Sequence, residues 1–122
     1  MTPNAGLLVQ TLKDVTVVTF PNGPLLDAQV IESVGLELNA LVEKQDRRKL
    51  LLDMAKVTHL SSAALSVLLA LRQKVEKAAG MLVICGLSPD LEKLFKITSL
   101  HKIFTFAANE GQALEKMGVS LS

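Results

Sequence analysis

The amino-acid sequence predicts an α/β fold: one domain over residues 1–122, with a mixed β-sheet of about five strands and about four helices. Short runs rich in β-branched residues alternate with longer segments in which apolar residues recur at helical spacing. Polar turns, several with glycine or proline, separate these segments. The expected order is β-β-α-β-α-β-α-β-α, in which an initial hairpin is followed by parallel crossover connections.

The first two predicted strands span residues 7–12 and 15–20 and form the hairpin. The second strand is almost continuously apolar, which predicts a position covered on both faces of the sheet. A Pro-Asn-Gly-Pro run at 21–24 ends it. Asp27 is a good N-cap, and apolar residues at helical spacing after it predict an amphipathic helix over 28–44.

The middle of the chain predicts a central strand over 49–54 and a helix over 62–79. Gly80 is placed to cap the end of that helix, and residues 81–85 form the next buried strand. Gly35 lies inside the preceding helix. A residue without a side chain at this point predicts a close contact between that helix and the sheet.

The last third of the chain predicts two short helices and one strand between them. Ser88 suits the N-cap of the first helix, and Pro89 suits its first position. Residues 103–106 form the last expected strand. Asn109 then caps a final helix that continues to Lys116.

The helix over 62–79 is apolar around more of its circumference than one core-facing stripe requires. Leu65, Val67 and Leu69 supply the extra width in its first turns. Two interpretations are open: the start of the helix is deeply buried, or part of it is a surface for a partner protein.

The charge balance gives no reason to expect nucleic-acid binding, because 13 basic and 12 acidic residues leave a formal charge of +1. The basic run at 47–49 is interpreted as a solvated turn. The one cysteine, Cys85, lies in an apolar run and is interpreted as a small core residue rather than a nucleophile. A single cysteine also excludes a disulfide within the chain, which fits a reducing compartment.

Targeting features are not predicted either. The N-terminus lacks the basic region and long apolar run of a signal peptide. No uninterrupted apolar stretch reaches the roughly 20 residues that a membrane span needs. The expected location is therefore the cytoplasm.

Enzyme motifs are mostly missing from the sequence, which has no G-x-x-x-x-G-K-[ST] or G-x-G-x-x-G loop. The two histidines, His59 and His101, have no cysteine or acidic partner at metal-ligand spacing. Ser61 and Ser62 lack the G-x-S-x-G context of a hydrolase nucleophile. We therefore expect no enzyme activity, no cofactor and no metal.

Exposed chemistry is concentrated in residues 58–65, between a buried strand and the apolar helix. Ser61 or Ser62 is expected to cap that helix, and such a cap contributes about 1 kcal/mol. The alternative role is modification, because the free N–H groups and dipole of a helix N-terminus favour an anion. A phosphate would add a charge of about −1.5 to −2, leave the helix folded and change what docks on its first turns.

Three stretches share their pattern with one known family. Residues 50–69 contain a strand, a short loop, S-S-A-A-L and a helix, where that family has D-S-S-G-L. Residues 23–28 end in L-D-A, and residues 87–104 run from L-S-P to L-H-K-I-F. Over nearly its whole length the chain thus resembles STAS domains, and more specifically the bacterial anti-sigma factor antagonists.

This resemblance implies a partner switch controlled by phosphorylation. An unphosphorylated antagonist binds an anti-sigma factor, usually a serine kinase of the histidine-kinase-like ATPase fold, and frees the sigma factor. The kinase phosphorylates a serine in the motif and breaks the complex, and a PP2C-type phosphatase restores it. The residues expected to contact the partner are Asp27, His59, Ser61, Ser62, Ala63, Leu65, Ser66 and Leu69.

Aligned on Leu65, the motif departs from the family pattern. Ser61 replaces the usual Asp, Ser62 matches the first serine, and Ala63 replaces the commonly phosphorylated second serine. Ser62 is therefore the expected phosphorylation site, with Ser61 second. Two alternatives are a STAS scaffold or accessory subunit of a transporter or signalling assembly without a switch, and a domain that binds a nucleotide or another small molecule or acts on it.

Overall fold

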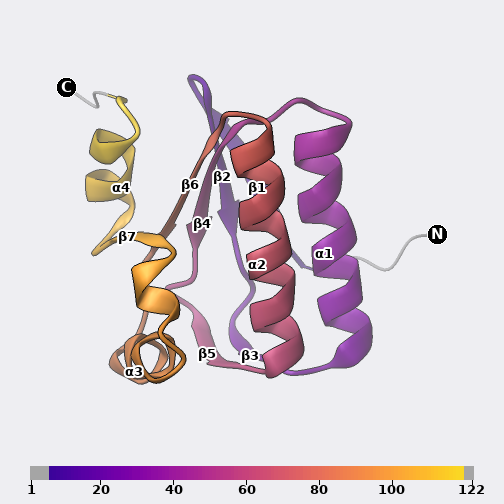
Figure 1. The fold of residues 1–122 in the computed structure, drawn as a ribbon, viewed down its shortest axis with the longest axis vertical. Coiled ribbons are helices and arrows are strands. Elements are labelled where there is room, and N and C mark those ends of the chain that lie inside the picture. The colour runs from indigo at the N-terminus through magenta and orange to yellow at the C-terminus, as the bar shows by residue number, and fades with distance from the viewer. Residues whose placement is uncertain (1–5, 120–122) are drawn as a thin grey trace.

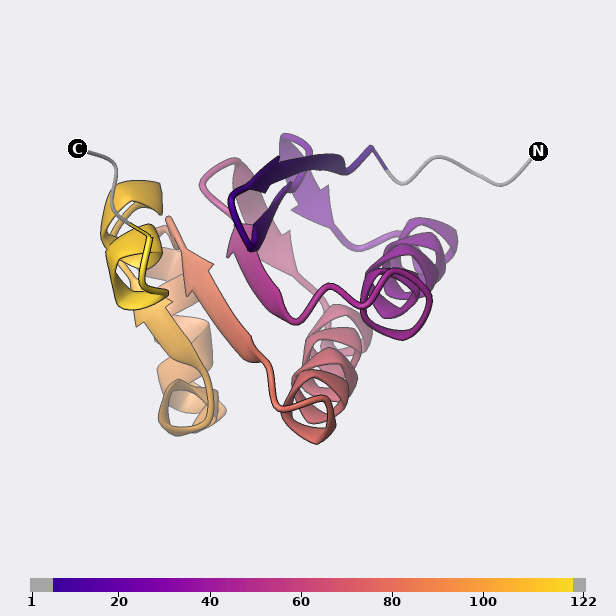
Figure 2. The same ribbon diagram turned by 90° about the horizontal axis from the view of Figure 1, so that it is seen from above.

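A computed structural model describes residues 6–119; residues 1–5, where no signal peptide is predicted, and residues 120–122 lie outside the described part. A five-stranded sheet forms the centre, with helices on both faces (Figures 1 and 2). Its strands, in spatial order, are β1 (Leu8–Leu12), β2 (Val15–Thr19), β4 (Lys49–Asp53), β6 (Met81–Cys85) and β7 (Thr105–Ala107). Only the hairpin pair β1–β2 is antiparallel, so the predicted mixed sheet is confirmed.

The helices divide between the two faces of this sheet. The long helices α1 (Ala28–Glu43) and α2 (Ser62–Lys77) lie side by side on one face, and α3 (Pro89–Ile97) packs into the same core. The short helix α4 (Glu110–Lys116) covers the opposite face (Figure 2). The α/β class and the predicted order of the main elements are therefore confirmed.

Two hydrophobic cores follow from the alternation of side chains along the strands. Leu50 and Leu52 of β4 face α1 and α2, whereas Leu51 faces α4 with Val17 of β2. All three leucines of β4 are fully buried. The prediction that β2 is covered on both faces is confirmed, because β2 lies inside the sheet and contributes to both cores.

A second, two-stranded parallel sheet was not predicted. It pairs β3 (Gly23–Leu25) with β5 (Val57–Leu60). The Pro-Asn-Gly-Pro run does end β2, but β3 begins within the same run. Three residues that include Gly23 and Pro24 have no strand periodicity, so only the pairing with a distant segment makes them a strand.

Most predicted helix starts are confirmed by their caps. The Ser88 hydroxyl oxygen accepts a hydrogen bond from the Leu91 amide at 3.2 Å, with Pro89 at the first helical position. The Asn109 side chain accepts one from the Gln112 amide at 2.9 Å. These contacts span only three residues, and such local contacts are what a sequence pattern predicts well.

Three local predictions were wrong. The end of α2 was predicted one residue too late: Ala79 is the left-handed residue, and the Gly80 amide completes the cap by donating to the Val75 carbonyl oxygen at 2.8 Å. Gly80 also makes room for a neighbouring backbone, because a Cβ there would lie 2.1 Å from the Arg48 carbonyl oxygen. Gly35 contacts the Val67 side chain of α2 rather than the sheet. The last strand begins at Thr105 rather than residue 103, because a 3₁₀ turn (Leu100–Lys102) carries the chain over the end of α3.

Candidate functional site

The pairing of β3 with β5 places the N-termini of α1 and α2 next to each other. β3 leads into α1 and β5 leads into α2, and Leu25 is opposite Leu60 in the parallel register. The Ser61 amide also donates a hydrogen bond to the Leu25 carbonyl oxygen at 3.3 Å. As a result, both helices begin at the same end of the molecule (Figure 1).

The cap of α1 is an exposed carboxylate at this end. One oxygen of Asp27 accepts hydrogen bonds from the amides of Gln29 and Val30, at 2.9 and 3.1 Å. A negative charge beside a helix N-terminus is favourable because it meets the positive end of the helix dipole. The predicted role of Asp27 as N-cap is confirmed, and its side chain faces solvent.

Ser61 is the cap of α2. Its backbone is extended, and its hydroxyl oxygen accepts a hydrogen bond from the Ala64 amide at 3.1 Å. Ser62 is the first residue of the helix and is exposed. Within residues 6–119, the Ser62 hydroxyl makes no hydrogen bond. The sequence left the two serines as alternative caps, and the structure separates a capping serine from an exposed one.

The other exposed residues predicted for partner contact lie close by. His59 is exposed on β5, two residues before the cap, and its Nδ1 is 3.1 Å from the Thr58 hydroxyl oxygen. Ala63 and Ser66 are exposed in the first turns of α2. Along the described chain, neither Ser61 nor Ser62 is hydrogen-bonded to a histidine.

Two apolar residues predicted to contact a partner are largely in the core. Leu65 is only 8% exposed, and Leu69 is half-buried against the same core. Val67 is half-buried and faces Gly35. The wide apolar surface of α2 is therefore mainly explained by its packing against α1 and the sheet.

Leu26 is an exposed apolar residue at this end that was not among the residues predicted to contact a partner. It precedes the Asp27 cap and is 54% exposed, whereas its neighbour Leu25 is buried. This exposure could have been predicted from the sequence. Successive side chains of an extended segment point to opposite sides, so only one residue of the Leu25–Leu26 pair can enter the core.

The helix-start surface, defined here as Leu26, Asp27, His59, Ser62, Ala63 and Ser66, is therefore exposed and lies beside two helix N-termini. The start of a helix is in general an electrostatically favourable place for an anion. In the described part of the chain there is no group of histidine, cysteine or acidic residues that could hold a metal ion. No helix between residues 6 and 119 is long and apolar enough to cross a membrane.

A family model described as "STAS domain" matches residues 7–113. BtrV of Bordetella bronchiseptica, provisionally named an anti-sigma factor antagonist, is 36% identical over 76 residues. That alignment covers 62% of this chain and 65% of BtrV, so the match spans slightly less than two thirds of the relative.

Solved structures agree in fold. An anti-sigma factor antagonist from Mycobacterium paratuberculosis has a TM-score of 0.80 at 23% identity, and the match covers 93% of each chain. SpoIIAA of Bacillus, solved in its phosphorylated form, has a TM-score of 0.71 at 15% identity over 91% of this chain and 98% of that one. At these identities the likeness concerns the fold alone.

Proposed function

The chain belongs to the STAS domain family, and on this basis we propose that it is an anti-sigma factor antagonist switched by phosphorylation of Ser62. It is a binding module without catalysis and acts in the cytoplasm. Its partner is an anti-sigma factor or a related serine kinase of the histidine-kinase-like ATPase fold. A PP2C-type phosphatase reverses the modification.

The observation that carries this proposal is the division of roles between the two serines. The Ser61 oxygen is engaged with the Ala64 amide and is half-buried, so it is the second candidate for phosphorylation. The Ser62 hydroxyl is exposed at the first position of α2, where a kinase can reach it. Modifying Ser62 leaves the cap of α2 in place.

Phosphorylation of Ser62 would change the surface without unfolding it. A phosphate at the first helical position meets free N–H groups and the positive end of the dipole. The added charge of about −1.5 to −2 would lie beside exposed Leu26 and Asp27. A partner that packs on this surface would have to desolvate the phosphate, which breaks the complex.

The named relatives support this proposal. BtrV shares 36% identity in the aligned region and is provisionally named an anti-sigma factor antagonist, and SpoIIAA, which shares the fold, has been solved in a phosphorylated form. The departure of the motif at Ala63 leaves Ser62 as the nearest hydroxyl to the usual acceptor position.

The test uses a serine kinase of the histidine-kinase-like ATPase fold, sought among the products of the neighbouring genes, with calorimetry for binding and intact mass for phosphate. The wild-type chain is expected to bind the kinase and, with ATP, to gain one phosphate that is lost in Ser62→Ala. Ser62→Asp is expected to weaken binding at least tenfold, or about 1.4 kcal/mol. Gln73→Asp is the matched control, because it adds the same charge to an exposed position far along α2.

Two outcomes would contradict the proposal. If the chain binds the kinase but gains no phosphate, and Ser62→Asp binds like Gln73→Asp, the chain is a scaffold in which Ser62 has no switching role. If the phosphate is still added to Ser62→Ala but not to Ser61→Ala, the switch exists and the assignment to Ser62 is wrong.

A further inference from the structure

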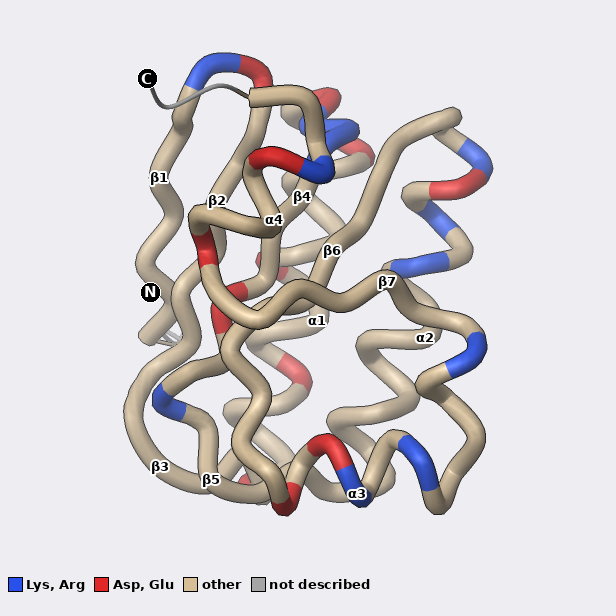
Figure 3. Tube along the Cα trace, turned by 90° about the vertical axis from the view of Figure 1, so that its left-hand side faces the viewer, with Lys and Arg blue, Asp and Glu red and all other residues tan. Residues whose placement is uncertain are grey.

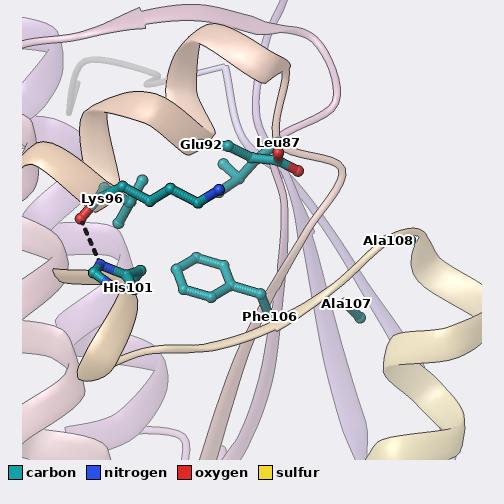
Figure 4. A pocket seen from close by; sticks show the side chains of 8 residues that line it. Leu87, Glu92, Lys96, His101, Phe106, Ala107 and Ala108 are labelled. Carbon is teal, nitrogen blue, oxygen red and sulfur yellow. Dashed lines mark hydrogen bonds between the residues drawn. The ribbon is translucent and has the colours of Figure 1, made fainter. Parts of the chain in front are cut away.

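A pocket of about 200 Å³ is lined by residues between Leu87 and Ala108, none of which belongs to the helix-start surface. An apolar cavity of about 150 Å³ can take a benzene ring, so this volume is enough for one ring-sized group. Figure 4 shows its residues around a common opening between α3, the 3₁₀ turn and β7. Its lining consists of Leu87, Glu92, Phe95, Lys96, His101, Phe106, Ala107 and Ala108.

The position of the pocket follows from the topology. β6 and β7 are parallel neighbours, and the pocket contains residues at or just after their carboxyl ends, Leu87 for β6 and Ala107 with Ala108 for β7. The connection after β6 leads to α3 on one face of the sheet, and the connection after β7 leads to α4 on the other. Where neighbouring connections diverge in this way, open α/β sheets form a crevice that takes ligands.

One wall of the pocket is aromatic in a chain that is otherwise poor in aromatic residues. Three of the four phenylalanines cluster here: Phe95 packs edge-to-face on Phe104 and Phe106, with ring centroids 5.8 and 5.3 Å away. Phe95 is buried, while Phe106 is half-buried and turns its ring toward the opening (Figure 4). Such a wall suits a flat or branched apolar group.

The rim of the pocket carries one charge of each sign. Glu92 and Lys96 are exposed and one turn apart on α3, an arrangement that normally favours an ion pair. Among the described residues, however, neither side chain takes part in an ion pair, and Lys96 extends along the opening (Figure 4). Figure 3 shows that the acidic positions lie at the start of α3 and the basic ones follow, so the rim has no single sign of charge.

His101 adds a third polar group to the rim. Its Nδ1 lies 3.4 Å from the Phe95 carbonyl oxygen, which can only accept, so Nδ1 carries the proton in this contact. In the neutral ring, Nε2 is then an acceptor. The rim thus offers two groups to a cation, the Glu92 carboxylate and the His101 imidazole. It offers the Lys96 ammonium group to an anion.

We propose that this pocket binds a free α-amino acid with an apolar, ring-sized side chain. The side chain occupies the aromatic wall, the α-ammonium group faces Glu92, and the α-carboxylate faces Lys96. An apolar cavity alone would take any small hydrophobic molecule, but opposite and unpaired charges at its mouth favour a zwitterion over a molecule with one charge. This proposal does not depend on the partner or on phosphorylation.

The test uses the whole chain and three probes that share a phenyl ring and a two-carbon arm: L-phenylalanine, 3-phenylpropionate and 2-phenylethylamine. Each is titrated to millimolar concentration while amide resonances are followed by two-dimensional NMR. L-Phenylalanine is expected to shift the amides of Leu87, Phe106 and Ala108, and to bind about tenfold more tightly than the other two, or about 1.4 kcal/mol. 3-Phenylpropionate, which carries only a carboxylate, also represents the C-terminal residue of a peptide. 2-Phenylethylamine, which carries only an ammonium group, represents the N-terminal residue.

Charge-neutral variants test which rim side chain recognises the ammonium group of the amino acid and which recognises its carboxylate. Glu92→Gln is expected to remove the preference over 3-phenylpropionate, and Lys96→Gln the preference over 2-phenylethylamine. Lys93→Gln on the same helix, outside the pocket lining, is the matched control. All these side chains are exposed, so the variants should fold.

Three results would overturn the proposal: no shift with L-phenylalanine, equal affinity for the three probes, or shifts confined to amides outside the pocket. Tighter binding of either single-charge probe would also contradict it, because the pocket would then recognise one end of a peptide.

Discussion

The Ser61 amide and the Leu25 carbonyl oxygen are joined by a hydrogen bond of 3.3 Å, although 36 positions separate the two residues in the sequence. This bond continues the β3–β5 ladder into the residue that caps α2. Since Leu25 is followed within two residues by the cap of α1, the bond also fixes the spacing between the two helix starts. The exposed residues of the helix-start surface therefore sit on a connected backbone rather than on independent loops.

The two serines should differ in their effect on stability. Ser61→Ala removes the acceptor of the Ala64 amide and should lower the free energy of unfolding by about 1 kcal/mol. Ser62→Ala should change it by less than about 0.5 kcal/mol, because alanine is the better helix former and no hydrogen bond is lost. Urea unfolding measures both values.

A Ser61→Asp variant serves as the control for this comparison. It keeps an acceptor at the cap and should retain most of the stability that Ser61→Ala loses. If Ser62→Ala proves the more destabilising of the two alanine variants, Ser62 is the cap and the assignment is reversed.

Two glycines should respond to alanine in opposite directions. Gly80→Ala should lower the free energy of unfolding by about 2–3 kcal/mol, because its Cβ would lie 2.1 Å from the Arg48 carbonyl oxygen and force the backbone apart. Gly35→Ala should raise it by about 0.5–1 kcal/mol, since the new Cβ meets Val67 at an ordinary 3.5 Å and alanine favours a helix. If urea unfolding shows that both variants lose the same free energy of unfolding, the α1–α2 contact at Gly35 is tighter than this geometry indicates.

Cys85 should be inert in the folded chain. It is only 1% exposed, and burial, with a smaller effect of Asp53, raises the pKa of its thiol from 9.0 to about 12. Because the thiolate is the reactive form, iodoacetamide should alkylate the native chain far more slowly than the urea-unfolded chain at pH 8. Similar rates in the two states would contradict the assignment of Cys85 to the core.

The same pKa shift predicts a pH effect on stability. The folded state holds the Cys85 proton more tightly than the unfolded state does. The contribution of this thiol to the free energy of unfolding is therefore fully present below pH 9.0 and is lost as the pH rises toward about 12. A Cys85→Ala variant should lose this part of the alkaline dependence. The comparison is made by urea unfolding of both chains between these pH values.

Short-range patterns predicted most of the fold. The strand and helix order, the hairpin and the caps at Asp27, Ser88 and Asn109 depend on residues a few positions apart, and the structure confirms them. Ser61 and Ser62 also lie at a helix start, as the sequence pattern predicted. The resemblance to STAS domains, rather than periodicity, supplied the proposed partner and switch.

What the sequence by itself determined is the set of local elements, because apolar periodicity and capping act within one or two turns. Only the tertiary structure decided that Gly23–Leu25 is a strand, that Ser61 rather than Ser62 is the cap, and that Gly80 accommodates the Arg48 carbonyl. It alone also placed Leu87 beside Phe106 in one pocket. The strand, the Gly80 contact and the pocket depend on contacts between segments far apart in the chain. The Ser61 cap is itself local, but a hydrogen bond from the Ser61 amide to the distant Leu25 carbonyl oxygen holds that residue in place.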